Sequence, residues 1–224
     1  MKLTVIGNYG PYPTKQGTAT SCYLYEENNV KILLDFGSGA IANLSSVCDI
    51  KDIDYIFISH LHYDHTSDLL PLRYLLHDKG KKINIITEYS DSEYYKLLFD
   101  SPEFEVINVD RNSTLKIANL ELSFYRTAHP VKNLGIKIKG EKTFTYTGDT
   151  IYFKGLEKHL KGADVVLIDG LKDSNFKGPH LKTVEAIKLQ NKLKGKYILT
   201  HESDYNISST EDVIVASNLA EYEF

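Results

Sequence analysis

The chain has 224 residues, of which 42% are hydrophobic and 25% charged, a balance typical of a folded globular protein with a sizeable core. Its net charge of −4 excludes the broad basic surface that holds nucleic acid tightly and without sequence preference. No apolar run approaches a membrane span, and the polar start at Met1 is too short for a signal peptide. We therefore expect one domain over residues 1–224 in the cytoplasm, with Cys22 and Cys48 as reduced, mostly buried thiols.

The first third of the chain predicts short strands joined by turns. Leu3–Ile6 is expected to form a strand, followed by a loop rich in glycine, proline and tyrosine. Ser21–Tyr25 and Val30–Leu34 predict a hairpin that turns around residues 27–29.

A histidine-rich stretch follows the apolar run Tyr55–Ile58, which predicts a buried strand. Because strand residues alternate between faces, His60 and His62 are expected to project the same way, whereas Asp64 and His65 lie past the turn and point elsewhere. The pattern favours two neighbouring metal sites over a histidine-rich surface loop. Imidazole suits zinc, iron and copper, and an added carboxylate suits zinc, iron or manganese.

The middle of the chain alternates helices and strands. Asp68–His77 predicts a helix with leucines on one face, and His77 is expected to be exposed near its end. A further strand, a helix and three short strands are expected at Ile83–Thr87, Asp91–Phe99, Phe104–Val109, Thr114–Ile117 and Leu120–Tyr125.

The second half repeats this order and brings further polar residues to strand ends. Its expected elements are the strands Leu134–Lys139, Thr143–Tyr146, Ala163–Asp169 and Lys196–Thr200, a short helix Gly155–Leu160, a helix that starts at or just after His180 and carries Ile187, Leu189 and Leu193 on its apolar face, and an edge strand at 213–215. His129, Asp149 and His201 each follow a strand. Gly148 gives Asp149 the backbone freedom to turn inward, where its two oxygens could reach two metals.

Some of these residues have plainer readings. His129 could be a capped loop histidine, and Asp149 could be a turn residue. His159 is expected to face solvent. His180 precedes a helix whose N-terminus favours an anion, and a local cap or packing role is its alternative.

Taken together, these motifs resemble the signature of the metallo-β-lactamase-fold hydrolases. The resemblance implies an α/β (α+β) fold, a four-layer αββα sandwich of two mixed β-sheets with helices on the outer faces. It implies two divalent metal ions, with zinc expected and manganese or iron as alternatives. One ion would be held by His60, His62 and His129, the other by Asp64, His65 and His201, with Asp149 and a water or hydroxide bridging them. Asp35 would brace the metal loop, or else cap a helix beginning near Ala40.

Within that family, the chain most resembles the ribonuclease Z-like phosphodiesterases. The similarity rests on Phe57–His62, Tyr146–Thr150 and Pro179–Leu181. It implies hydrolysis of a phosphodiester by a metal-bound hydroxide. Asp64 and His180 are the expected catalytic residues: Asp64 would orient the hydroxide or relay its proton, and His180 would stabilise the phosphoryl transition state.

Two departures from ribonuclease Z argue against transfer RNA as the substrate. Only 30 residues separate Asp149 from His180, which leaves no room for the long basic arm that grips transfer RNA. The segment 202–205, Glu-Ser-Asp-Tyr, lacks the arginine that the family tends to carry there. We therefore expect a small-molecule or short nucleic-acid phosphodiester, with no membrane partner. The enzyme alternative is an acyl hydrolase, a lactonase or thioesterase, and the non-enzyme alternative is a scaffold. A homodimer is a further expectation from the family.

Overall fold

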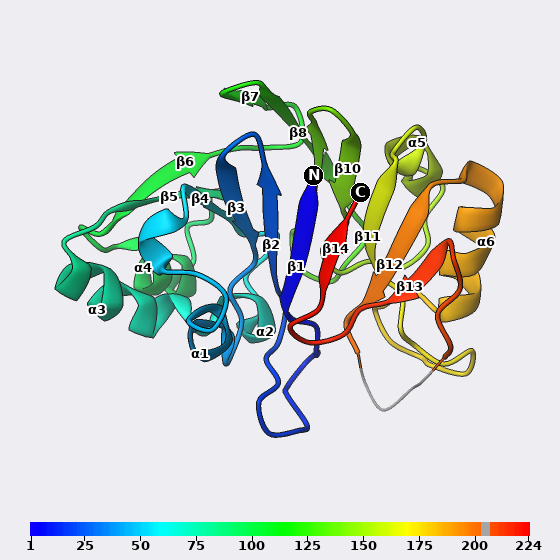
Figure 1. Cartoon of the computed structure of the whole chain (residues 1–224), viewed down its shortest axis with the longest axis horizontal. Helices are drawn as coiled ribbons and strands as arrows, with labels where there is room; N and C mark the ends of the chain where they lie inside the picture. Colours follow the sequence, from blue (N-terminus) through cyan, green and yellow to red (C-terminus); the bar gives the residue numbers. More distant parts are fainter. Residues whose placement is uncertain (203–206) are drawn as a thin grey trace. The chain divides into compact units, whose positions relative to one another are not determined.

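The computed structural model describes residues 1–202 and 207–224, and the described chain divides into two compact units. Unit 1 comprises residues 1–109 and 217–224, and unit 2 comprises residues 110–216. Each unit contains one seven-stranded mixed β-sheet with helices packed on it, as Figure 1 shows. The expectation of a single domain stays a prediction.

The sheet of unit 1 has the strand order β14-β1-β2-β3-β4-β5-β6. Strands β1 to β3 are antiparallel neighbours, and β3 to β6 are parallel. The strands are β1 (Lys2–Gly7), β2 (Cys22–Glu27), β3 (Val30–Leu34), β4 (Tyr55–Phe57), β5 (Ile83–Thr87), β6 (Phe104–Asn108) and β14 (Glu221–Glu223). Because β3, β4 and β5 are parallel, the loops that follow them all start at the same edge of the sheet.

Four α-helices and one 3₁₀ turn belong to the described part of unit 1: α1 (Ala40–Leu44), η1 (Ile50–Asp52), α2 (Tyr63–Thr66), α3 (Leu69–Lys79) and α4 (Glu93–Phe99). Helix α3 buries Leu69, Leu72 and Leu76, spaced three and four residues apart on one face. Helix α4 is capped by Ser92, whose hydroxyl accepts the backbone N–H of Tyr95 at 3.1 Å. These helices share one core cluster with the sheet of unit 1.

The sheet of unit 2 has the strand order β13-β12-β11-β10-β9-β8-β7. Its antiparallel part runs from β7 to β10 and its parallel part from β10 to β13, which repeats the plan of the first sheet. The strands are β7 (Thr114–Ile117), β8 (Leu120–Arg126), β9 (Leu134–Lys139), β10 (Thr143–Tyr146), β11 (Val165–Asp169), β12 (Lys196–Thr200) and β13 (Val213–Val215). Helices α5 (Leu156–Leu160) and α6 (Thr183–Leu193) pack on this sheet around Leu156, Leu160 and Leu189.

The expected fold class is confirmed in its two mixed sheets with helices, and most expected elements are present within one or two residues. Three local expectations were wrong or incomplete. Asp64 and His65 lie past the turn, as expected, but in a short helix, α2, that was not predicted. Strand β14, which pairs with β1, was not predicted. His159 is only partly exposed, since its ring stacks on Tyr125 with centroids 4.5 Å apart and an interplanar angle of 8°.

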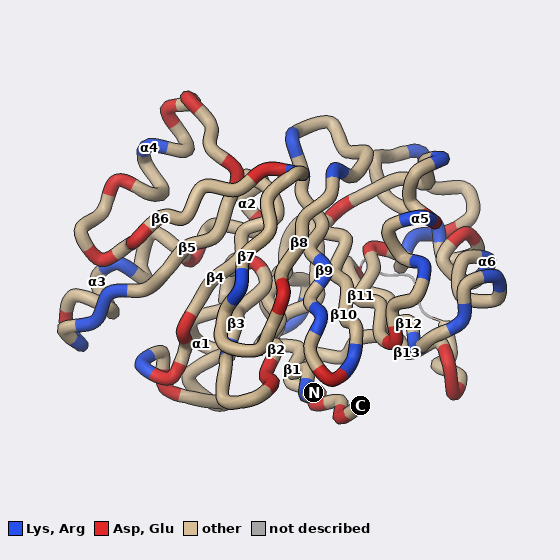
Figure 2. The backbone as a smooth tube through the Cα atoms, turned by 90° about the horizontal axis from the view of Figure 1, so that it is seen from above, with Lys and Arg blue, Asp and Glu red and all other residues tan. Residues whose placement is uncertain are grey.

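Charged residues of both signs are spread over the elements (Figure 2). Lysines are frequent around α5 and α6, and acidic residues around α4 and β6, as the two colours of the figure show. Among the described residues, no helix has the length and apolar character needed to cross a bilayer.

Candidate metal centre

The histidine loop of unit 1 begins where β4 ends. Ile58 still donates its backbone N–H to Ile86 of β5, and the chain then leaves the sheet through Ser59, His60 and His62 into α2. His60 Nε2 and His62 Nδ1 lie 3.0 Å apart. His65 Nε2 lies 3.7 Å from Asp64 Oδ2. The rings of His60 and His65 are also close, with centroids 4.1 Å apart, and the division of these residues between two metal sites stays a prediction.

A buried carboxylate, Asp35, holds this loop in place. Its Oδ1 accepts the backbone N–H of Ser59 at 2.7 Å, and its Oδ2 accepts the Ser59 hydroxyl at 2.8 Å and His65 Nδ1 at 2.7 Å. Asp35 and His65 are fully buried. The alternative role as a helix cap is wrong, because the residue that precedes α1 is Gly39. Asp35 therefore braces the loop, as the family resemblance implied.

The same contacts decide which ring nitrogens of unit 1 can bind a cation. A carboxylate only accepts hydrogen bonds, so His65 Nδ1 carries the proton and Nε2 keeps its lone pair. The Ser59 hydroxyl donates to Asp35, so its oxygen accepts from His60 Nδ1 at 3.0 Å. His60 Nε2 is then also a lone-pair nitrogen. In both histidines Nδ1 donates a hydrogen bond and Nε2 carries a lone pair. Metal-binding histidines in other proteins have the same arrangement.

Unit 2 carries a second polar cluster around Asp149, which is 3% exposed. Gly148 has a φ of 58°, a left-handed conformation that glycine adopts at little cost and that turns the chain after β10. Asp149 Oδ1 lies 3.4 Å from His201 Nδ1, and Asp149 Oδ2 lies 3.8 Å from His129 Nε2. The two carboxylate oxygens therefore face different histidines, which is the geometry that a bridging ligand needs.

His129 is oriented by the backbone. Its Nδ1 lies 3.1 Å from the carbonyl oxygen of Pro179, which can only accept, so Nε2 keeps the lone pair on the side of Asp149. Asn133 and Thr127 contact the main chain of Asp149. Their side chains donate to the Asp149 backbone carbonyl oxygen at 2.9 and 3.1 Å, respectively. Both are buried, so they hold the backbone from which the carboxylate projects.

His180 belongs to the same cluster but has a different partner. Its Nδ1 lies 2.8 Å from Oδ2 of Asp169, the last residue of β11, and 3.7 Å from Asp149 Oδ2. Its ring also stacks on His201 at 4.4 Å. Asp149, Asp169 and His180 each offer an atom within 4.8 Å of the others. Helix α6 begins three residues later, at Thr183, so His180 precedes the helix as expected.

Burial and charge shift the titration of this pair. Burial raises the pKa of Asp169 to about 6, against the hydrogen bond from His180. Burial opposes protonation of His180, but the hydrogen bond and the charge of Asp169, followed by the charge of Asp149, outweigh it and raise the pKa of His180. The protonation of each group therefore depends on the other through this hydrogen bond.

Comparison with known proteins places the chain in a family. The model of the β-lactamase superfamily domain matches residues 31–201. The chain belongs to this superfamily. The match includes every predicted ligand, from His60 to His201.

Two relatives show where in the superfamily the likeness lies. A probable metallo-hydrolase, YhfI of Bacillus subtilis, is 27% identical over 219 residues, covering 92% of this chain and 89% of the relative. Its crystal structure superposes with a TM-score of 0.91 at 23% identity, over 99% of this chain and 98% of that one. Ribonuclease Z of Ignicoccus hospitalis is 23% identical over 234 residues, covering 94% and 78% of the two chains.

A diphosphatase of the PhnP family is a further structural neighbour, with a TM-score of 0.80 at 18% identity, over 100% of this chain and 97% of that one. These likenesses confirm the metallo-β-lactamase fold and the recognised resemblance. They support a hydrolase and divalent metal binding for this superfamily member.

The donor set of each unit suits divalent cations. In each unit imidazole nitrogens lie beside a carboxylate, and His65 and His129 donate their other ring nitrogen to a carboxylate or a carbonyl. That outer contact fixes the tautomer and raises the basicity of a ligating imidazole. Imidazole together with carboxylate fits zinc, iron or manganese better than calcium or magnesium.

Asp169, Asn133 and Thr127 were missed by the sequence interpretation. Asp169 had a readable signal, because it ends the apolar run Val165–Ile168, just as the histidine loop ends the run at Ile58. Asn133 and Thr127 had none, since they are ordinary loop residues whose role depends on where Asp149 lies. The comparison at residues 202–205 stays open, because residues 203–206 lie outside the described part of the chain.

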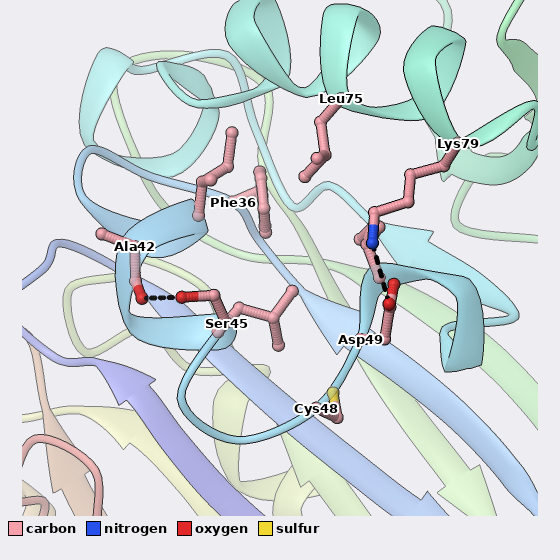
Figure 3. Close-up of a pocket in the computed structure, with 10 residues that line it drawn as sticks. Phe36, Ala42, Ser45, Cys48, Asp49, Leu75 and Lys79 are labelled. Atoms are coloured by element: carbon pink, nitrogen blue, oxygen red, sulfur yellow. Dashed lines mark hydrogen bonds and ion pairs between the residues drawn. The ribbon is translucent and has the colours of Figure 1, made fainter.

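A separate cavity of about 360 Å³ lies in unit 1 between α1, η1 and α3 (Figure 3). Its walls are mostly apolar, with Phe36 and Leu75 among them, and an ion pair between Lys79 and Asp49 at 2.9 Å lies at its side. None of the predicted metal ligands lines it. The cavity is therefore distinct from the histidine loop.

Proposed function

We propose that this superfamily member is a dinuclear, metal-dependent phosphodiesterase of the ribonuclease Z-like type that acts on a small or unstructured phosphodiester. The proposal takes four ligands from unit 1 and three from unit 2. One ion is assigned to His60, His62 and His129, the other to Asp64, His65 and His201, and Asp149 to both. Zinc is the proposed metal, with manganese or iron as alternatives.

The observation that carries the proposal is the pair formed by His180 and Asp169. Asp169 accepts the Nδ1 proton of His180 at 2.8 Å, so the ring is held in one orientation with Nε2 available to a substrate. When both ring nitrogens carry a proton, this imidazolium can donate from Nε2. A protonated imidazole beside a phosphate stabilises the charge that develops on phosphoryl or leaving-group oxygens. A hydrolase of uncharged esters has less use for such a group.

Bound divalent cations supply Lewis-acid stabilisation of phosphoryl oxygens and an activated water at neutral pH. The side chains of the chain do the rest. Asp64 is assigned to orient the attacking water or to accept its proton. His180 is assigned to the developing negative charge and to protonation of the leaving oxygen. Asp169 is a positioning residue, since it acts through His180.

The test is a comparison of His180→Ala with wild type in metal content and in kcat/KM on bis-p-nitrophenyl phosphate and on a lactone. We expect unchanged metal content and a loss of about 10²–10³-fold on the phosphodiester, the usual cost of removing one preorganised donor. His77→Ala is the matched control, because His77 is an exposed histidine of α3 that hydrogen-bonds Glu103. Loss of metal together with activity would mean that His180 is a ligand and that its assigned role is wrong.

Two outcomes bear on the substrate. Robust lactone or thioester hydrolysis without phosphodiester cleavage would replace the proposal with the acyl-hydrolase alternative. Accurate 3′ processing of a precursor transfer RNA would contradict the proposal that the substrate is a small or unstructured phosphodiester. We expect no such processing, because only 30 residues lie between Asp149 and His180 and the net charge is −4.

A further inference from the structure

An aromatic cluster lies at the edge of the unit 1 sheet that carries the histidine loop. Strands β4 and β5 are parallel neighbours, so the loop after Phe57 and the loop after Thr87 start from the same edge. The first loop leads to Tyr63 in α2, and the second leads past Tyr89 to Tyr94 in α4. The rings of Tyr63 and Tyr94 meet edge to face, with centroids 5.1 Å apart and an interplanar angle of 86°.

Tyr63 stands between His62 and Asp64, two predicted ligands, yet it is 71% exposed. A single exposed aromatic residue is not unusual by itself. Tyr63 differs because the ring of Tyr94 packs against it. Tyr94 is only partly exposed, and its hydroxyl lies 2.9 Å from the Thr66 hydroxyl.

The support continues into the histidine loop. Thr66 is fully buried, and its Oγ1 donates to the carbonyl oxygen of His62 at 2.9 Å. The backbone of Tyr63 is fixed as well, because its carbonyl accepts the N–H of Ser67 at 2.9 Å. The contacts from His62 through Thr66 to Tyr94 therefore tie the support of the exposed ring to the loop that carries the predicted ligands.

From this arrangement we infer that Tyr63 contacts the substrate and stacks on a nucleobase, which makes nucleotide esters the preferred phosphodiesters. The inference deepens the proposed function and rests on it for the reaction. A tyrosine held by its neighbour loses little conformational entropy on binding, and its face offers a flat apolar surface. Nucleobases stack on such rings with little regard to sequence, whereas alkyl groups lack a π-face.

The position limits which base can be bound. The residues on both sides of Tyr63 are predicted ligands, so a base on this ring belongs to the nucleotide whose phosphate is cleaved or to its neighbour.

A second exposed aromatic residue, Tyr89, precedes α4. It is 58% exposed, and its ring packs on Tyr95 with centroids 5.4 Å apart.

The first experiment compares two esters with the same scissile bond. Thymidine 5′-(p-nitrophenyl phosphate) and ethyl p-nitrophenyl phosphate share a leaving group and differ in the group that could stack. We expect wild-type, metal-loaded protein to prefer the nucleoside ester through KM. Tyr63→Ala should lower that preference about ten- to a hundred-fold, and Tyr63→Phe should retain it. Tyr74→Ala is the control, because Tyr74 is 76% exposed on α3 and should leave the preference unchanged.

The second experiment reads binding without turnover. The chain contains no tryptophan, so Tyr63→Trp introduces a single indole. Thymidine 5′-monophosphate should quench its fluorescence saturably, whereas the indole introduced by Tyr74→Trp should not respond. Equal loss on both esters in Tyr63→Ala would reduce Tyr63 to a structural role. Absence of quenching, or equal quenching at both positions, would overturn the inference.

The two proposals fail in different ways. If wild-type protein cleaves neither ester but the nucleotide quenches the introduced indole, the proposed reaction is wrong and the stacking site stands. If both esters are cleaved with equal efficiency and no quenching occurs, the phosphodiesterase stands and the stacking site does not.

Discussion

At the scale of single residues, the histidine loop depends on one carboxylate. Asp35 has a φ of 60°, a conformation that aspartate tolerates better than bulkier residues. From there its two oxygens receive three donors, two from Ser59 and one from His65. Because Ser59 in turn receives His60 Nδ1, a single buried charge orients two histidines.

We expect Asp35→Asn to weaken metal binding about 10–100-fold. An amide offers one accepting oxygen and one donating NH₂ group. The NH₂ therefore opposes either the Ser59 backbone N–H, at the Oδ1 position, or both the Ser59 hydroxyl and His65 Nδ1, at the Oδ2 position, so part of the bracing is lost in either orientation. Competition with a chromophoric chelator measures the change. Asp54→Asn is the matched control, since the Asp54 carboxylate accepts the Lys31 N–H at 2.9 Å at an exposed position. Equal affinities in wild type and Asp35→Asn would contradict the bracing role.

The sequence predicted the residues whose signal is local. His60, His62, Asp64 and His65 lie within six residues directly after an apolar run, and the strand edge brings them together. The partner of His180 could not be predicted in the same way. Asp169 meets it only because β11 ends beside the loop before α6, which depends on the packing of the sheet.

At the scale of elements, strand and helix limits followed from periodicity, and failures occurred where pairing is long-range. Strand β14 has the short sequence Glu-Tyr-Glu, with both glutamates exposed, so it shows no core pattern. It exists because its register places Tyr222 opposite Leu3, more than two hundred residues away. His159 was misjudged for a similar reason, since its stacking partner lies on β8, a different element.

The packing of His159 of α5 on Tyr125 of β8 predicts that the folded state loses stability at acidic pH. Burial lowers the pKa of His159, and the charges of Lys137 and Lys158 lower it further. In the unfolded chain His159 returns to its ordinary pKa of about 6.5 and binds a proton more readily. The unfolded state then holds more protons, so the contribution of His159 to stability is present above that pH and is lost as the pH falls.

The variant His159→Phe keeps a ring for stacking and cannot titrate. We expect the urea midpoint of wild type to fall more than that of His159→Phe between pH 7.5 and pH 5.5, with metal held at saturation. All other titrating groups are common to both proteins, so the difference between the two midpoints isolates His159. Parallel decreases in the two midpoints would exclude this origin of acid sensitivity.

At the scale of the whole molecule, the proposed ligands divide between the two compact units. His60, His62, Asp64 and His65 come from unit 1, and His129, Asp149 and His201 come from unit 2. A ligand that binds only the folded state stabilises it by mass action. Metal binding is therefore expected to stabilise the folded chain.

Elemental analysis of protein purified without chelators should give about two equivalents of metal per chain. A metal concentration 100-fold above its dissociation constant contributes about 2.7 kcal/mol, so a chelator should lower the melting temperature by about 5–10 °C in a chain of this length. His62→Ala, in unit 1, and His201→Ala, in unit 2, should each lose one equivalent. Hydrogen exchange should accelerate on chelation in both β4 and β11, because each sheet loses a stabilising ligand. One equivalent in wild type, unchanged after metal is added, would refute the dinuclear site, and faster exchange in one sheet alone would contradict the assignment of ligands to the other sheet.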